Sequence, residues 1–137
     1  MPTLTAADVN AFLAEVFPSA ATSGFSCEAL GERSSVARWR YDPGALRPGN
    51  YISGPTQFTL ADTALWFACF TELGLEAMAV TSELSIRYLR PAQGGDLLAR
   101  CALQSVSRRR LVGTVELWVE GAEDKLVALA QGSYARP

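Results

Sequence analysis

The chain has 137 residues, 49% of them hydrophobic and 19% charged, and a formal net charge of −2. The length fits one compact domain, and the hydrophobic fraction excludes general disorder. The slightly negative charge argues against a nucleic-acid-binding protein, which usually has a basic surface. The chain contains no histidine, which excludes Ser-His-Asp and Cys-His hydrolysis and zinc sites with histidine ligands. A carboxylate, hydroxyl, thiol or amine must therefore carry any proton transfer in an active site of this chain.

The first predicted element is an amphipathic helix over residues 5–17. Thr5 can cap this helix together with Asp8 three residues later. Its apolar positions follow helical spacing and are Val9, Phe12, Leu13 and Val16. Pro18 is expected to end the helix. Two short strands joined by a turn near residues 31–34 are predicted between residues 25 and 41.

A loop rich in glycine and proline, residues 42–54, leads into the second predicted helix, residues 55–73. Pro55 suits the first helical position and Gly74 suits the C-terminal cap. The helix is apolar on nearly all sides, which predicts that it is buried. Its polar residues, among them Asp62, are confined to the N-terminal half.

Four segments with alternating apolar residues follow, so the main strands are predicted over residues 78–136. Short turn sequences separate them, which is typical of antiparallel strands. We therefore predict a single α+β domain over residues 1–137, in which one curved antiparallel sheet wraps around the central helix.

The cysteines Cys27, Cys69 and Cys101 form no CxxC pair. Their odd number and wide spacing predict free thiols and no metal site, and we interpret Cys69 as a small buried apolar residue. No basic segment followed by a long apolar run opens the chain, and the longest apolar stretch, residues 64–70, is far too short to span a membrane. We therefore expect a cytoplasmic protein without a membrane segment.

Asp62 and Gly54 are the candidates for chemistry. An ionised carboxylate among apolar neighbours is costly unless it is paired or hydrogen-bonded, and Gly54 has no side chain to keep a ligand from its backbone N–H at a helix N-terminus. A carboxylate and an oxyanion donor suit hydrolysis of a thioester, because the thiolate leaves without protonation. The alternative is that Asp62 is a solvated residue complementing the helix dipole and that Gly54 belongs only to a turn.

Further residues have both a binding and a structural interpretation. Trp66 could line an acyl pocket or pack in the core. Arg87, Arg90 and the arginines at 108–110 could bind the phosphates of coenzyme A, although residues 108–110 equally suit a solvated hairpin tip. Asn50 could hydrogen-bond a ligand or stabilise a turn.

Four segments of the sequence resemble the hotdog-fold thioesterases of the phenylacetate-degradation (PaaI-like) type. They are Ile52-Ser53-Gly54-Pro55 followed by Leu60-Ala61-Asp62, then Leu84-Ser85-Ile86-Arg87-Tyr88-Leu89-Arg90-Pro91-Ala92, and Gly95-Asp96-Leu97. The resemblance covers about residues 25–137. It implies the hotdog fold, in which a curved antiparallel sheet wraps a long helix.

The resemblance also implies an activity, the hydrolysis of acyl-CoA. Asp62 would act as general base or nucleophile, the Gly54 N–H would polarise the thioester carbonyl, and Thr81 would orient water. Substrate contacts are expected from Asn50, Ser53, Pro55, Trp66, Ser85, Arg87 and Arg90. No cofactor is implied beyond the coenzyme A of the substrate. The family pattern further implies a homodimer, with the carboxylate facing the loop of the other subunit, that assembles into a homotetramer.

The sequence departs from this family in the loop before the central helix. Ser53-Gly54-Pro55 stands in place of the usual His-Gly-Gly, and Arg47 stands where an asparagine is common. The second hypothesis is therefore a non-catalytic hotdog module that binds acyl-CoA or another apolar ligand. A hotdog dehydratase or hydratase is disfavoured because those enzymes generally use histidine.

Overall fold

The computed structural model of the chain describes residues 3–137. It begins with two helices, α1 (Ala6–Val16) and α2 (Pro18–Thr22). The predicted capping box is present, since Asp8 N–H donates to Thr5 Oγ1 at 3.1 Å and Thr5 N–H donates to Asp8 Oδ2 at 2.9 Å. Pro18 follows the end of α1 but also begins α2, a helix that the sequence analysis did not predict. Proline is tolerated there because the first helical N–H has no intrahelical acceptor.

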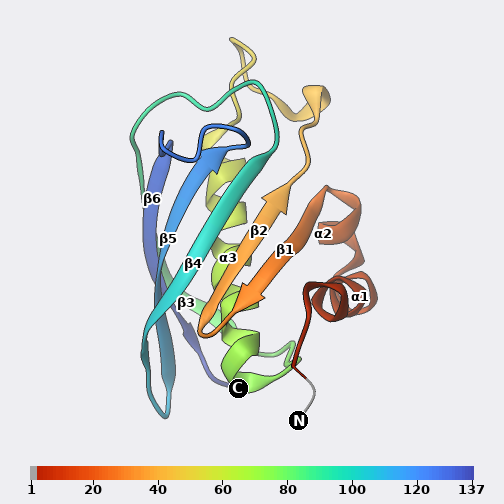
Figure 1. Cartoon of the computed structure of the whole chain (residues 1–137), viewed down its shortest axis with the longest axis vertical. Helices are drawn as coiled ribbons and strands as arrows, with labels where there is room; N and C mark the ends of the chain where they lie inside the picture. Colours follow the sequence, from red (N-terminus) through yellow and green to blue (C-terminus); the bar gives the residue numbers. More distant parts are fainter. Residues whose placement is uncertain (1–2) are drawn as a thin grey trace.

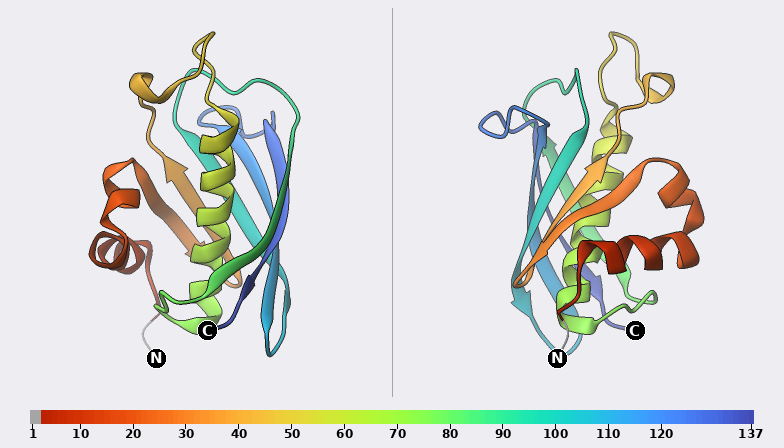
Figure 2. Two further views of the ribbon diagram at one scale, coloured as in Figure 1. Left: turned by 180° about the vertical axis from the view of Figure 1, so that it is seen from behind. Right: turned by 45° about the vertical axis from the view of Figure 1, so that its right-hand side comes forward.

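Six strands form one antiparallel sheet in the order β1-β2-β4-β5-β6-β3. The strands are β1 (Phe25–Gly31), β2 (Ser34–Trp39), β3 (Val80–Tyr88), β4 (Leu97–Val106), β5 (Arg110–Val119) and β6 (Ala128–Ala135). The sheet curves around one long helix, α3 (Gly54–Leu73), as Figures 1 and 2 show. The predicted fold class, an α+β hotdog arrangement, is confirmed.

The helix α3 is buried along most of its length, which explains why its sequence is apolar on nearly all sides. Leu60, Leu65, Phe67 and Phe70 are each at most 2% exposed, and each such side chain contributes roughly 1.5–3 kcal/mol when transferred from water. The helix ends at Gly74, whose φ of 77° lies in the left-handed region that favours glycine. The loop before α3 contains one 3-10 turn, Pro43–Ala45.

The two edge strands of the sheet differ in how their outward backbone groups are hydrogen-bonded. At the β1 edge, Asn10 of α1 accepts from the Cys27 N–H at 2.7 Å and donates to the Cys27 carbonyl at 2.9 Å. This side chain therefore occupies the N–H and the carbonyl of Cys27, two of the hydrogen-bonding groups that an edge strand leaves open. At the other edge, β3 pairs with β6 alone in the described part of the chain, and most of its residues are exposed.

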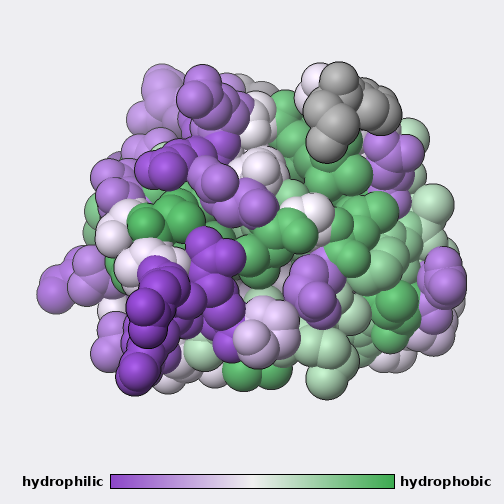
Figure 3. Space-filling model, turned by 90° about the horizontal axis from the view of Figure 1, so that it is seen from below, coloured by the Kyte–Doolittle hydropathy of each residue, from purple (hydrophilic) through white to green (hydrophobic). Residues whose placement is uncertain are grey.

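Exposed apolar side chains gather where the chain passes from α3 into β3. Leu75, Met78 and Val80 are 40%, 68% and 58% exposed. Viewed from this end, the molecule carries hydrophobic surface beside strongly hydrophilic surface (Figure 3). No helix within residues 3–137 is long and apolar enough to cross a membrane.

Candidate active site

The carboxylate of Asp62 is held by two hydroxyl groups from adjacent strands. Thr81 in β3 donates to Asp62 Oδ1 at 2.7 Å, and Tyr134 in β6 donates to the same oxygen at 2.9 Å. The two residues are direct partners in the sheet, so the register of β3 on β6 places both hydroxyls at this turn of α3. No described residue donates to Asp62 Oδ2. One carboxylate oxygen is therefore fixed, and the other is free to act on a bound molecule.

Tyr134 is a site residue that the sequence analysis missed. Its side chain is buried, and burial followed by the negative charge of Asp62 raises the pKa of its hydroxyl above the usual value. The hydroxyl therefore stays protonated and remains a donor to the carboxylate. The alternation of Ala128, Ala130 and Tyr134 in the last predicted strand indicated an inward-facing residue, but such a tyrosine is equally expected of an ordinary core.

A pocket of about 320 Å³ lies beside Asp62. Its walls are mostly apolar and include Leu13, Phe17, Ala20, Phe25 and Trp66. Trp66 combines the two predicted possibilities, because it lines this pocket and its ring also packs edge-on against Phe17 and Phe70. The Asp62 carboxylate thus lies at the wall of a pocket whose surface is mostly apolar.

The cysteines contribute no nucleophile to the pocket beside Asp62. Cys69 and Cys101 are fully buried and Cys27 is 4% exposed. Burial raises the pKa of each thiol to about 12. At neutral pH none of the three forms the thiolate that nucleophilic attack needs, and the interpretation of Cys69 as a buried apolar residue is confirmed.

Gly54 is the first residue of α3, after the N-cap residue Ser53. Its backbone N–H belongs to the first turn, where the helix supplies no acceptor, so this N–H can bind an oxygen of a ligand. Its carbonyl accepts a hydrogen bond of 2.8 Å from the Tyr88 hydroxyl. A Cβ atom at residue 54 would lie 3.1 Å from Tyr88 Oη, so the close approach of this tyrosine favours glycine.

Gly54 lines a second pocket, of about 690 Å³, which does not include Asp62. Two predicted substrate contacts, Pro55 and Arg90, line the same pocket. So do Gln57 and Arg47, neither of which the sequence analysis placed in the site. In a single chain, the carboxylate and the proposed carbonyl-binding N–H therefore open into different pockets.

Ser53 and Asn50, both predicted to contact substrate, have local structural roles. Ser53 Oγ accepts the Thr56 N–H at 3.2 Å and donates to Thr56 Oγ1 at 2.9 Å, and so caps α3. Asn50 adopts a left-handed conformation with a φ of 61°, and its N–H donates to the Arg47 carbonyl at 3.1 Å. These contacts match the turn interpretation of Asn50.

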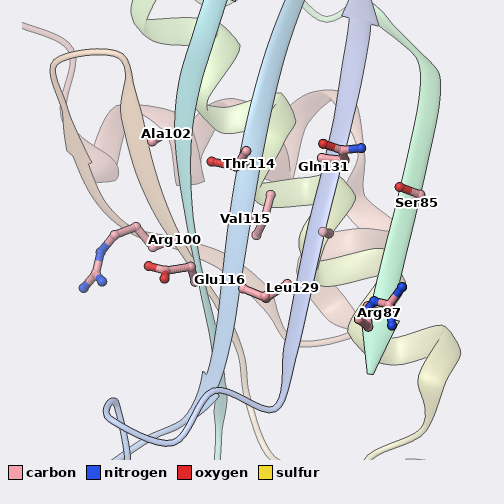
Figure 4. A pocket seen from close by; sticks show the side chains of 10 residues that line it. Ser85, Arg87, Arg100, Ala102, Thr114, Val115, Glu116, Leu129 and Gln131 are labelled. Carbon is pink, nitrogen blue, oxygen red and sulfur yellow. The ribbon is translucent and has the colours of Figure 1, made fainter. Parts of the chain in front are cut away.

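Ser85 and Arg87 lie on the face of the sheet that points away from α3. They line a pocket of about 520 Å³ together with Arg100, Thr114, Glu116 and Gln131 (Figure 4). The structure does not bring them to Asp62 or Gly54 within one chain. Residues 108–110 are exposed at the turn between β4 and β5, where a solvated hairpin tip was the alternative.

A family model described as the thioesterase superfamily matches residues 49–125, a segment that contains Gly54, Asp62 and Thr81. The chain belongs to the thioesterase superfamily. This membership supports hydrolysis of acyl thioesters as its general reaction. A search of curated proteins finds no significant match.

Several solved structures are similar to this chain. A candidate thioesterase from Silicibacter sp. is 33% identical, with a TM-score of 0.88 over 100% of this chain and 94% of that one. The PaaI protein of the Escherichia coli phenylacetic acid degradation operon is 27% identical, with a TM-score of 0.79 over 94% and 91%. A mutant PaaI from Thermus thermophilus is 28% identical, with a TM-score of 0.74 over 88% and 99%. The resemblance predicted from the motifs is confirmed.

Proposed function

We propose that this thioesterase hydrolyses acyl-CoA, with Asp62 as general base or nucleophile and the Gly54 N–H bound to the thioester carbonyl oxygen. As a base, Asp62 takes a proton from water while the water oxygen bonds to the carbonyl carbon. The C–S bond then breaks, and the products are a carboxylic acid and the thiolate of coenzyme A. As a nucleophile, Asp62 forms an acyl anhydride with loss of the same thiolate, and water then hydrolyses the anhydride.

One observation carries this proposal: a half-buried carboxylate fixed at Oδ1 by two hydroxyls and free at Oδ2 beside an apolar pocket. The fixed oxygen orients the carboxylate, which is the main requirement for an effective base or nucleophile. The free oxygen can meet water or the thioester. The apolar pocket suits the acyl group.

We propose that the active site is completed by a second copy of the chain, in a homodimer formed through the β3 edge. Unlike β1 at Cys27, β3 has no side chain covering its open hydrogen-bonding groups in the described residues. Val80 and Tyr88 at its two ends and Leu89 just after it are exposed by 58%, 48% and 45%. An open strand with apolar neighbours favours pairing with another strand. Further pairing of such dimers would give the expected homotetramer.

The register that such a dimer needs can be derived from β3 itself. Thr81 contacts Asp62 and Tyr88 contacts Gly54, and the irregularity between Thr81 and Glu83 lets both residues face α3 although their separation is odd. Suppose that β3 of one copy pairs antiparallel with β3 of the other, with the two Ser85 residues opposite each other. Ser82 is bulged and has no partner, so Thr81 and Tyr88 each lie three paired positions from Ser85. Thr81 of one copy would then lie opposite Tyr88 of the other, and Asp62 would approach the Gly54 pocket of the second copy.

The Gly54 pocket has features that suit coenzyme A. Arg47 and Arg90 line it, and neither forms an ion pair within the described chain. Guanidinium groups bind phosphates well. Leu89 and Ala92 add apolar lining to this pocket. The pocket can therefore bind both the uncharged arm of coenzyme A, through its apolar lining, and the phosphates, through the two arginines.

The experiment is hydrolysis of a panel of acyl-CoA thioesters, measured by release of free thiol. Wild-type protein is expected to hydrolyse at least one member, and Asp62→Asn is expected to lose about 100-fold or more in kcat, the usual contribution of a positioned base. Undiminished activity of Asp62→Asn would refute the mechanism.

The second candidate, a binding module without catalysis, is favoured by one observation. The side chain of Ser53, which stands in place of the family histidine, is used to cap α3. Tight binding of acyl-CoA by wild-type protein with no turnover on any thioester would establish this alternative, and robust turnover would eliminate it.

A further inference from the structure

Gln57 carries a buried acceptor without a partner. Its side chain is 4% exposed, and its Oε1 atom has no hydrogen-bond partner in the described chain. Ser35, also polar and buried, is satisfied, because its hydroxyl donates to the Ala64 carbonyl at 2.6 Å. Buried polar atoms are nearly always hydrogen-bonded, so Gln57 Oε1 calls for a donor from outside the chain.

The orientation of the Gln57 side-chain amide is fixed by the hydrogen bond that its NH₂ group makes. Nε2 donates to the Ile52 carbonyl at 3.2 Å. Turning the amide over would place two acceptor oxygens against each other, since only the NH₂ group can donate. Oε1 is therefore the free atom, and the missing partner must be a hydrogen-bond donor.

The position of Gln57 indicates which donor. Gln57 lines the same pocket as Gly54 and follows it by three residues on α3, so the two are neighbours on one helix face, where Cβ positions are about 5–6 Å apart. Gly54 is the residue proposed to bind the thioester carbonyl. In an acyl-CoA, two methylene groups join the sulfur to the first amide N–H of the pantetheine chain, so a donor follows the thioester at a similar distance.

We infer that Gln57 Oε1 accepts a hydrogen bond from the pantetheine amide N–H nearest the thioester sulfur. This inference rests on the proposed function and adds the part of the thiol that the enzyme recognises. The Gly54 N–H and Gln57 Oε1 then form a donor and an acceptor at adjacent positions of one pocket. The Gly54 N–H binds the thioester carbonyl and Gln57 Oε1 binds the amide N–H. The site therefore favours pantetheine thioesters over simple alkyl thioesters.

The test compares one acyl group on three thiols: coenzyme A, N-acetylcysteamine, which keeps the amide N–H without the nucleotide, and 1-butanethiol, which has no amide. Gln57→Met removes the acceptor at nearly constant volume. It is expected to lower kcat/KM about tenfold for the first two thioesters, the loss of one hydrogen bond, and to leave the butanethiol ester within twofold. Equal change for all three, or no change, would overturn the inference.

A binding measurement separates this inference from the proposed function. Calorimetry with an unreactive S-alkyl pantetheine thioether is expected to give about tenfold weaker binding for Gln57→Met than for wild type, whether or not the protein turns over any thioester. Equal binding would refute the role of Gln57 alone. Absence of hydrolysis by wild-type protein would instead refute the proposed function. Gln57→Leu serves as the second variant if Gln57→Met fails to fold.

Discussion

The Thr81 hydroxyl donates a 2.7 Å hydrogen bond to Asp62 Oδ1 and thereby ties the edge strand β3 to the central helix. Tyr134 donates to the same oxygen from the neighbouring strand. Two strands and a helix thus converge on one carboxylate atom. If β3 also pairs with a second copy of the chain, as we propose, the orientation of the catalytic group depends on the strand that forms the dimer.

The first prediction concerns these two hydroxyl groups. Thr81→Val is expected to lower kcat about tenfold or more, because a hydrogen bond to a charged group contributes roughly 1.5–3 kcal/mol and the carboxylate loses its orientation. Tyr134→Phe should act in the same direction. Thr81→Ser, which keeps the hydroxyl, should retain most of the activity. Steady-state hydrolysis of one acyl-CoA measures all three, and equal activity of the valine and serine variants would contradict the prediction.

The second prediction isolates the backbone donor of Gly54. Gly54→Pro and Gly54→Ala both add a Cβ atom near Tyr88, but only proline removes the N–H, and proline is compatible with the first turn of a helix. We expect Gly54→Pro to lower kcat by about 100-fold or more, as the loss of an oxyanion donor does. Gly54→Ala should lose much less. Similar losses in both variants would mean that crowding, and not the N–H, controls the rate.

The third prediction tests whether one site is shared between two chains. Asp62→Asn and Gly54→Pro homodimers are each expected to be inactive. In a mixed dimer, one site carries both defects and the other carries neither. Equal amounts of the two variants, unfolded and refolded together, should therefore recover about a quarter of wild-type activity by random pairing. No recovery, with heterodimers verified by mass, would show that each site lies within a single chain.

Local sequence patterns predicted the fold well because each element carries its own signal. Alternation marked the strands, and the apolar character of residues 64–70 required a helix that is covered on most sides. The second helix, α2, was missed because a proline such as Pro18 can either end one helix or begin another. The local sequence does not distinguish these two outcomes, which depend on tertiary packing. A five-residue helix has too little periodicity to be detected.

The candidate site was less predictable than the fold. Asp62 stood out because a carboxylate in an apolar helix needs a partner, but its partners lie 19 and 72 residues away in sequence, and their meeting depends on strand register. Gln57 resembled an ordinary helix residue until its burial and its unpartnered oxygen were known. Residues such as Ser85 and Arg87 matched the family motif, yet the alternation of β3 turns them to the other face of the sheet.

The fourth prediction concerns stability and pH, at an ion-pair cluster that does not include Asp62 or Gly54. Arg38 forms ion pairs with Glu28, Asp96 and Glu120, and Asp96 also accepts the Tyr41 N–H at 2.8 Å. Burial acts to raise the pKa of Asp96, but the hydrogen bonds from Tyr41 and Arg38 outweigh it, so the pKa of this carboxyl is lowered on folding. Asp96 thus joins the start of β4 to β2.

A carboxyl with a lowered folded pKa stabilises the native state above its unfolded pKa, about 3.9 for aspartate, and this stabilisation is lost as the pH falls through the folded value. Asp96→Asn should therefore melt a few degrees below wild type at pH 7, and the difference should shrink steadily below about pH 4. Calorimetric melting from pH 7 to pH 2 measures it, with Glu15→Gln, an exposed helix carboxylate without an ion pair in the described chain, as the matched control. A difference that stays constant down to pH 2 would show that Asp96 stabilises the fold through its shape and not its charge.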